Sequence, residues 1–182
     1  LKIANQFGNE ERIIIAQQNI SATYSYLQDY ESALQYLLPS VAYFEKTKND
    51  ARLSLIYDNL GVIYRETKQY AKALLYHQKA LAIARNSENN YDIANVLSNL
   101  GNAYTSLKKY DTALAIMQES LQIARKENYD NIVSNVIGNI GALLIKQGRY
   151  DSVQFYCLEG LNLAKKLGDS LTMVNNIYGL AL

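Results

Sequence analysis

Side chains that could hold or act on another molecule are few in this sequence, and the most regular of them are asparagines. Asn19, Asn59, Asn99 and Asn139 recur at one constant interval. A side-chain amide carries both a hydrogen-bond donor and an acceptor, so it can pair with a peptide backbone through two hydrogen bonds. Asparagine is a mediocre helix former. Its recurrence within predicted helices leaves three explanations: a ladder that binds an extended peptide, amides that cap or bridge neighbouring helices, and coincidence.

The residues with catalytic potential occupy places that other repeats fill with apolar side chains. His77 is the only histidine, and it stands where Leu37, Met117 and Cys157 stand elsewhere in the repeat. We therefore expect His77 to be a packing residue. Cys157 is the only cysteine and is expected to be a small buried apolar group. One cysteine excludes both an internal disulfide and a multi-cysteine metal site.

Motifs and composition argue against catalysis and against two classes of partner. The sequence has no Gly-Lys-Ser or Gly-Lys-Thr phosphate loop and no Gly-x-Ser-x-Gly elbow. The formal net charge is +1 and no basic stripe is present, so we expect no nucleic-acid binding. The longest apolar runs, at 13–16 and 142–145, are too short to cross a bilayer, so we expect no membrane insertion. The chain is not expected to be an enzyme or to hold a metal or cofactor.

Internal repetition organises the whole chain. The segments 69–74 and 109–114 match after the same shift that relates the asparagines, and 29–34 and 149–153 fall at the same spacing. Asn-Leu-Gly-x-x-Tyr occurs at 59–64 and again at 99–104, while Leu-Ala-Ile-Ala at 81–84 is echoed at 121–124 and 161–164. Apolar residues in each unit follow helical spacing in two stretches separated by short polar breaks. Each unit is therefore predicted to be a pair of antiparallel helices.

Small residues at fixed places indicate how the two helices of a pair pack. Gly61, Gly101 and Gly141 lie in the middle of the predicted first helices. Glycine there costs about 1 kcal/mol relative to alanine. That cost is acceptable if the missing side chain allows the second helix to approach closely. Pro39 lies within a predicted second helix and is expected to kink or shorten it.

The repeat boundaries define one array that is cut at both ends. Because the sequence opens with Leu1 and begins and ends within a repeat, we expect it to be a piece of a longer protein with exposed apolar ends, which favour end-to-end self-association. The expected segments are the tail of a preceding repeat at 1–8, repeats at 9–48, 49–88, 89–128 and 129–168, and the start of a fifth repeat at 169–182.

These motifs resemble the tetratricopeptide repeat family. Leu60-Gly61-Val62-Ile63-Tyr64 followed by Ala73 and Ala80 fits its signature, except that His77 stands where an aromatic residue is usual. The resemblance implies an all-α fold, a right-handed α-solenoid of antiparallel helix pairs. The period, about 40 residues, exceeds the common period of about 34 residues. Such long repeats are similar to those of polarity adaptors, bacterial peptide-responsive regulators and sensor regions of bacterial signalling proteins.

The same resemblance implies where a partner binds. In this family the first helices line a concave face, and an asparagine ladder resembles that of the O-linked N-acetylglucosamine transferase. The implied function is a scaffold that binds a protein or an extended peptide on this face. The alternative is the sensory input region of a bacterial histidine kinase or transcriptional regulator whose output domain lies outside this segment. Cytoplasmic and bacterial periplasmic locations both stay open. The expected contact residues are Asn19, Asn59, Asn99, Asn139, Asp58, Arg65, Asn95, Asn102 and Asn135.

Overall fold

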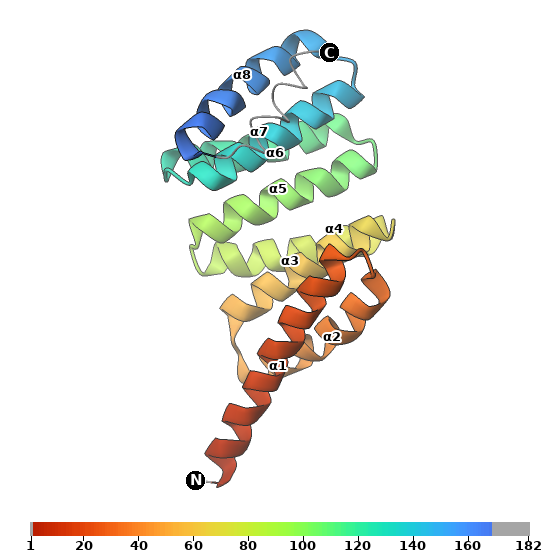
Figure 1. The fold of residues 1–182 in the computed structure, drawn as a ribbon, viewed down its shortest axis with the longest axis vertical. Coiled ribbons are helices and arrows are strands. Elements are labelled where there is room, and N and C mark those ends of the chain that lie inside the picture. Colours follow the sequence, from red (N-terminus) through yellow and green to blue (C-terminus); the bar gives the residue numbers. More distant parts are fainter. Residues whose placement is uncertain (1, 169–182) are drawn as a thin grey trace. The chain divides into compact units, whose positions relative to one another are not determined.

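The computed structural model describes residues 2–168 of the chain, and within them it contains eight α-helices and no β-strand (Figure 1). The all-α fold predicted from the sequence is thereby confirmed. In the described part of the chain, no helix is both long and apolar enough to cross a membrane. The helices are α1 (Lys2–Tyr26), α2 (Tyr30–Thr47), α3 (Asp50–Glu66), α4 (Tyr70–Asn86), α5 (Asn90–Ser106), α6 (Tyr110–Lys126), α7 (Asp130–Lys146) and α8 (Tyr150–Leu167).

Each repeat is built from two backbone segments of equal length, and each segment is a helix followed by the same turn. One residue in every turn adopts a left-handed conformation, and these residues are evenly spaced along the chain. In the turn after α3, the amide of Gln69 donates to the carbonyl of Tyr64 at 2.8 Å, and Lys109 bonds Tyr104 in the same way after α5. These bonds satisfy carbonyls that a helix end leaves without a partner. The left-handed residues are Gln28, Lys48, Lys68, Glu88, Lys108, Asn128, Gly148 and Gly168.

The chain divides into two compact units, and the first of them ends at Ser87. In the first unit, α2 packs against α1 and α3, and α4 packs against α3. Its core is made of the apolar stripes that the helical spacing predicted, and many of these side chains are completely removed from solvent. The buried side chains include Ala33, Leu37, Phe44, Ile56, Leu60, Ile63, Ala73 and Ala80.

In the second unit, α7 has the most neighbours, because it packs against α5, α6 and α8. Its core is a single cluster of buried apolar side chains, and several residues of α7 within it are at most 1% exposed. Burial of this many aliphatic side chains is the main force that holds the unit together. The cluster includes Ala113, Met117, Leu121, Ala124, Val136, Ile137, Ile140, Leu143 and Leu144.

The close approach expected at the mid-helix glycines occurs at two of the three positions. A Cβ atom on Gly61 would lie 2.5 Å from the His77 ring, and one on Gly101 would lie 2.5 Å from Met117. A Cβ atom on Gly141 would meet nothing within 4 Å. The difference follows from the residue on the second helix, because position 157 is a cysteine, which is smaller than His77 or Met117.

Two local expectations concern the bounds of α1 and α2. At the repeat boundary expected between residues 8 and 9 the structure has no turn, since α1 runs without interruption from Lys2 to Tyr26 and keeps the backbone hydrogen bonds that a turn would lose. Of the two effects expected of Pro39, shortening does not occur, since α2 has 18 residues, whereas α4 and α6 have 17. The predicted start of a fifth repeat lies outside the described residues, and so does the self-association surface expected at that end.

Candidate functional site

The four recurring asparagines lie on the first helix of each helix pair, and none of them belongs to the buried core. Asn19 on α1 and Asn59 on α3 are exposed, while Asn99 on α5 and Asn139 on α7 are half-buried. Each of the last three is followed by a buried residue, and Leu60, directly after Asn59, is 0% exposed. The helix therefore keeps the apolar residue inside and presents the amide outside the core on the same turn.

In the second unit, an amide cluster joins the two first helices. The Nδ2 group of Asn139 donates to Ser98 Oγ on α5 at 3.0 Å and to Asn135 Oδ1 on its own helix at 3.0 Å. Nearer the start of α7, Asn131 Nδ2 donates to the hydroxyl of Tyr91 at 2.9 Å. Asn139 thus bridges neighbouring helices, as the second explanation of the repeat requires. The two bonds use only its amino group, so its Oδ1 takes no part in them.

In the first unit, the corresponding surface of α3 is open and partly apolar. Leu55 is 50% exposed, Asn59 is exposed, and Val62 is half-buried. These residues are spaced i, i+4 and i+7 and so share one face of the helix. This face offers an amide flanked by two aliphatic side chains. The equivalent positions of α5 carry amides instead, at Asn95, Asn99 and Asn102.

The remaining predicted contact residues are distributed differently from the expectation. Asp58 was expected to face a partner, but it is only 4% exposed because its carboxylate turns toward α4 and pairs with His77. Arg65 is half-buried and forms an ion pair of 2.6 Å with Glu66. Asn95 and Asn102 on α5 are half-buried, and Asn135 on α7 is exposed.

The two residues with catalytic potential are both shielded from solvent. His77 is 0% exposed, and its Nδ1 lies 2.7 Å from Asp58 Oδ1. Cys157 is 6% exposed, and burial raises the pKa of its thiol above the ordinary value, which lowers the fraction of reactive thiolate. Among the described residues, no three His, Cys, Asp or Glu side chains cluster in a way that could hold a metal ion.

A tyrosine cluster joins α3 to α4 in the first unit. The rings of Tyr64 and Tyr76 stack at 5.3 Å, and Tyr57 lies 5.7 Å from Tyr76. The hydroxyl of Tyr57 donates to Glu45 Oε1 on α2 at 2.7 Å. Burial and this hydrogen bond raise the pKa of Tyr57 to about 12. Lys79 lies 5.1 Å from the Tyr57 ring centroid, within cation–π range.

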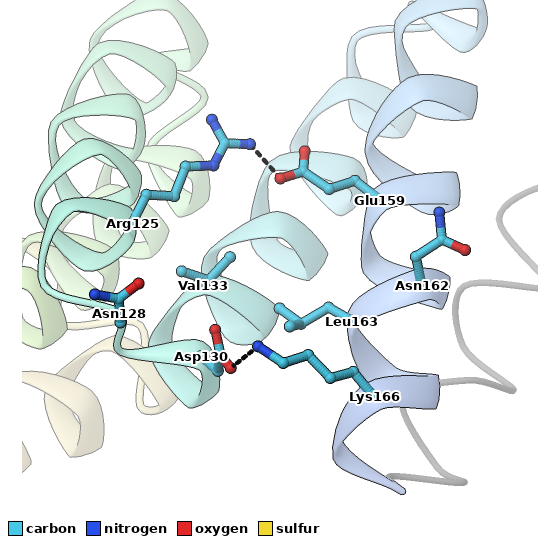
Figure 2. A pocket seen from close by; sticks show the side chains of 8 residues that line it. All are labelled: Arg125, Asn128, Asp130, Val133, Glu159, Asn162, Leu163 and Lys166. Carbon is cyan, nitrogen blue, oxygen red and sulfur yellow. Dashed lines mark hydrogen bonds and ion pairs between the residues drawn. The ribbon is translucent and has the colours of Figure 1, made fainter.

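A groove between α6, α7 and α8 was not found by sequence reasoning (Figure 2). Its volume is about 320 Å³. Arg125 on α6 pairs with Glu159 on α8, and Lys166 on α8 pairs with Asp130 of α7 at 2.7 Å. The sequence contains one signal that could have revealed this groove: in each of the two ion pairs, the oppositely charged residues lie a little less than one repeat apart. We call this surface the α6–α8 groove, and its lining residues are Arg125, Asn128, Asp130, Val133, Glu159, Asn162, Leu163 and Lys166.

Several solved structures share this fold at low sequence identity. A Rap protein complexed with competence and sporulation factor matches with a TM-score of 0.85 and 18% identity, over 91% of this chain and 46% of that chain. Aspartyl phosphate phosphatase F from Bacillus subtilis matches with a TM-score of 0.84 and 18% identity, over 93% of this chain and 45% of that one. This chain therefore spans less than half the length of either protein.

A third match is a signal transduction ATPase with numerous domains from Pyrococcus horikoshii, which has a tetratricopeptide repeat sensor. Its TM-score is 0.81 and its identity 21%, over 94% of this chain and 26% of that chain. Among curated proteins, none matches this sequence. The model of the tetratricopeptide repeat family matches residues 12–86 and 92–166, which together make up most of the sequence. The chain belongs to the tetratricopeptide repeat family.

Proposed function

We propose that this chain is a binding scaffold that holds an extended peptide segment of a partner protein against the first helices of its repeats. The observation that carries the proposal is the placement of the recurring asparagines. All four lie outside the core on corresponding helices, at positions where an asparagine lowers helix propensity. A contact with a partner explains why an amide recurs there.

The chemistry of the side-chain amide indicates the class of partner. An amide that donates and accepts matches the N–H and C=O of a peptide backbone, whatever the side chains of that peptide are. In the first unit, Leu55 and Val62 flank Asn59 and offer apolar contact to an aliphatic side chain of the same peptide. In the second unit, the contact with Ser98 and Asn135 holds the amino group of Asn139 in place and leaves its Oδ1 as the acceptor.

Similar structures support this class of function. One of them is complexed with competence and sporulation factor, and another carries a tetratricopeptide repeat sensor. At 18% and 21% identity these matches establish the shared fold, and the proposal of peptide binding rests on the amides of this chain together with that fold.

Retention of the labelled protein on an array of immobilised random decapeptides tests the proposal. We expect the Asn59→Ala, Asn99→Ala double variant to lose retention on the strongest spots. Two lost hydrogen-bonding groups at about 1 kcal/mol each predict a roughly 30-fold weaker affinity. Asn86→Ala is the matched control, because Asn86 is an exposed asparagine at the end of α4 outside the recurring set. Equal retention of the double variant and the control, at unchanged helical circular dichroism, excludes binding through these amides.

A second role, as the sensory input region of a bacterial signalling protein, is favoured by the likeness to the repeat sensor of the signal transduction ATPase. In that role the bound peptide changes the activity of a domain outside this segment. The sequence of the full-length protein distinguishes the two roles. A kinase, ATPase or DNA-binding domain in the same chain supports the sensory role, and a chain made only of repeats removes it.

A further inference from the structure

The α6–α8 groove has charged groups at both ends and apolar groups between them. Figure 2 shows the Arg125–Glu159 pair at one end, the Asp130–Lys166 pair at the other, and the side chains of Val133 and Leu163 between the two pairs. Val133 is 7% exposed and Leu163 is half-buried, so together they form an apolar floor. A groove of about 320 Å³ is large enough for a ligand of only a few residues.

The charged side chains at each end of the groove have hydrogen-bonding groups that their ion pair does not use. The Arg125–Glu159 contact uses one guanidinium nitrogen, and a guanidinium has five N–H donors. Glu159 Oε2 is buried and has no hydrogen-bond partner among the described residues. At the other end, Lys166 uses one of its three donors on Asp130 Oδ2. Each end can therefore accept either an ammonium or a carboxylate group.

The balance of charge selects the kind of ligand. Two cations and two anions line the groove, one of each at either end, so their charges cancel and the groove has no net attraction for a ligand with an excess of one sign. A zwitterion is itself neutral overall, and each of its charged ends can pair with the opposite charge at the end of the groove that it meets. The apolar floor adds a preference for an aliphatic group between the two charges.

The length of the groove gives the size of that zwitterion. Glu159 and Lys166 are two helical turns apart on α8, which corresponds to a rise of about 10 Å along a helix. An extended peptide spans roughly 3.3–3.6 Å per residue, so a tripeptide covers the same distance. We propose that the α6–α8 groove binds a free tripeptide whose termini engage the two ion pairs and whose central aliphatic side chain rests on Val133 and Leu163.

None of the four recurring asparagines lines this groove, so the proposal does not depend on peptide binding by those asparagines. The test is a nuclear magnetic resonance titration of the Val133 and Leu163 methyl groups with alanyl-leucyl-alanine. The same tripeptide with an acetylated amino end and an amidated carboxyl end serves as the uncharged probe. We expect saturable shifts of both methyl groups with the free tripeptide and at least tenfold weaker binding of the capped one.

Variants separate this site from the rest of the chain. Glu159→Gln and Lys166→Met remove one charge from each end and are each expected to weaken tripeptide binding at least threefold. Lys126→Met is the matched control, because Lys126 is the exposed lysine one repeat before Lys166, and it is expected to bind as the wild type does. The Asn59→Ala, Asn99→Ala variant is also expected to bind normally. Absence of methyl shifts at millimolar tripeptide, or equal binding of the free and capped forms, overturns the proposal.

Discussion

His77 Nδ1 lies 2.7 Å from Asp58 Oδ1, so α4 and α3 are joined by two polar side chains that are both removed from solvent. Corresponding positions in the second unit carry Ser98 with Met117, and Gly138 with Cys157. The repeat therefore does not require this pair for packing. Among the described residues, His77 Nε2 has no hydrogen-bond partner, so the buried ring is only partly satisfied.

A double-mutant cycle measures the coupling of this pair. Asp58→Ser or His77→Met alone removes one member of this buried pair and is expected to lower the free energy of unfolding by about 3 kcal/mol. The double variant Asp58→Ser, His77→Met reproduces the Ser98 and Met117 combination and is expected to be at least as stable as the wild type. Urea unfolding followed by circular dichroism gives all four values. Additive losses in the double variant would show that the two side chains do not stabilise each other.

A serine hydroxyl links the two helices of a pair in both units, but in opposite directions. Ser54 Oγ on α3 donates to the carbonyl of Ala80 on α4 at 3.1 Å. In the next repeat, Ser120 Oγ on α6 donates to the carbonyl of Ala94 on α5 at 2.6 Å. The serine and the alanine have exchanged places, and the contact between the helices is kept.

Ser120→Ala is expected to lower the free energy of unfolding by about 1 kcal/mol, since it removes this hydrogen bond. Ser40→Ala is the opposite case. Ser40 occupies the equivalent place on α2, is 0% exposed, and its hydroxyl has no partner among the described residues. Its replacement by alanine is expected to raise stability by about 1 kcal/mol. The thermal unfolding midpoints of the two variants measure whether stability falls in Ser120→Ala and rises in Ser40→Ala. A lower midpoint for Ser40→Ala than for the wild type contradicts the prediction.

Alanine substitutions at two glycines are expected to have opposite effects. In Gly61→Ala the new methyl group meets the His77 ring, and overpacking of this kind costs about 1–3 kcal/mol. In Gly141→Ala the methyl group has open space, so the gain in helix propensity of about 1 kcal/mol is retained. Urea midpoints of the two variants measure the difference. A Gly61→Ala variant that is more stable than the wild type would mean that α4 can move away from α3 without a loss of stability.

The raised pKa of Tyr57 predicts that the folded protein loses stability at alkaline pH. Its pKa is about 12 in the folded protein against an ordinary value of 10.0, so between these pH values the unfolded chain releases a proton that the folded chain keeps. The free energy of unfolding therefore falls as pH rises through this range. Below the ordinary pKa both states keep the proton, and Tyr57 adds no pH dependence. Tyr57→Phe is expected to unfold with a shallower dependence on pH in this range, and equal slopes contradict the assignment.

Much of the fold could be predicted from sequence because the constant repeat period and the helical apolar spacing fix which residues are buried. The close contact of Gly61 with His77 follows the same logic, since a glycine within a helix suggests a near neighbour. The repeat boundary expected after residue 8 coincides with no turn, since α1 continues through it, and the repeat period alone does not show whether the chain folds back there. Gly141 shows a further limit, because its free space depends on the size of Cys157.

The binding surface could be predicted only in part. The period places the recurring asparagines on one type of helix, but it does not show that Asn139 bonds Ser98. Asp58 was misplaced because its partner His77 lies on the second helix, several turns away along the chain. The α6–α8 groove was missed because its residues come from three helices and from the turn between α6 and α7, and they do not share one repeat position.

The most direct test of recognition by the recurring asparagines is a nuclear magnetic resonance titration of the asparagine side-chain amides. The ligand is the decapeptide retained most strongly on the random array. We expect it to shift the amide signals of Asn19, Asn59, Asn99 and Asn139 and to leave that of Asn86 unchanged. Saturation that shifts Asn86 but none of the recurring four would contradict the proposed binding surface.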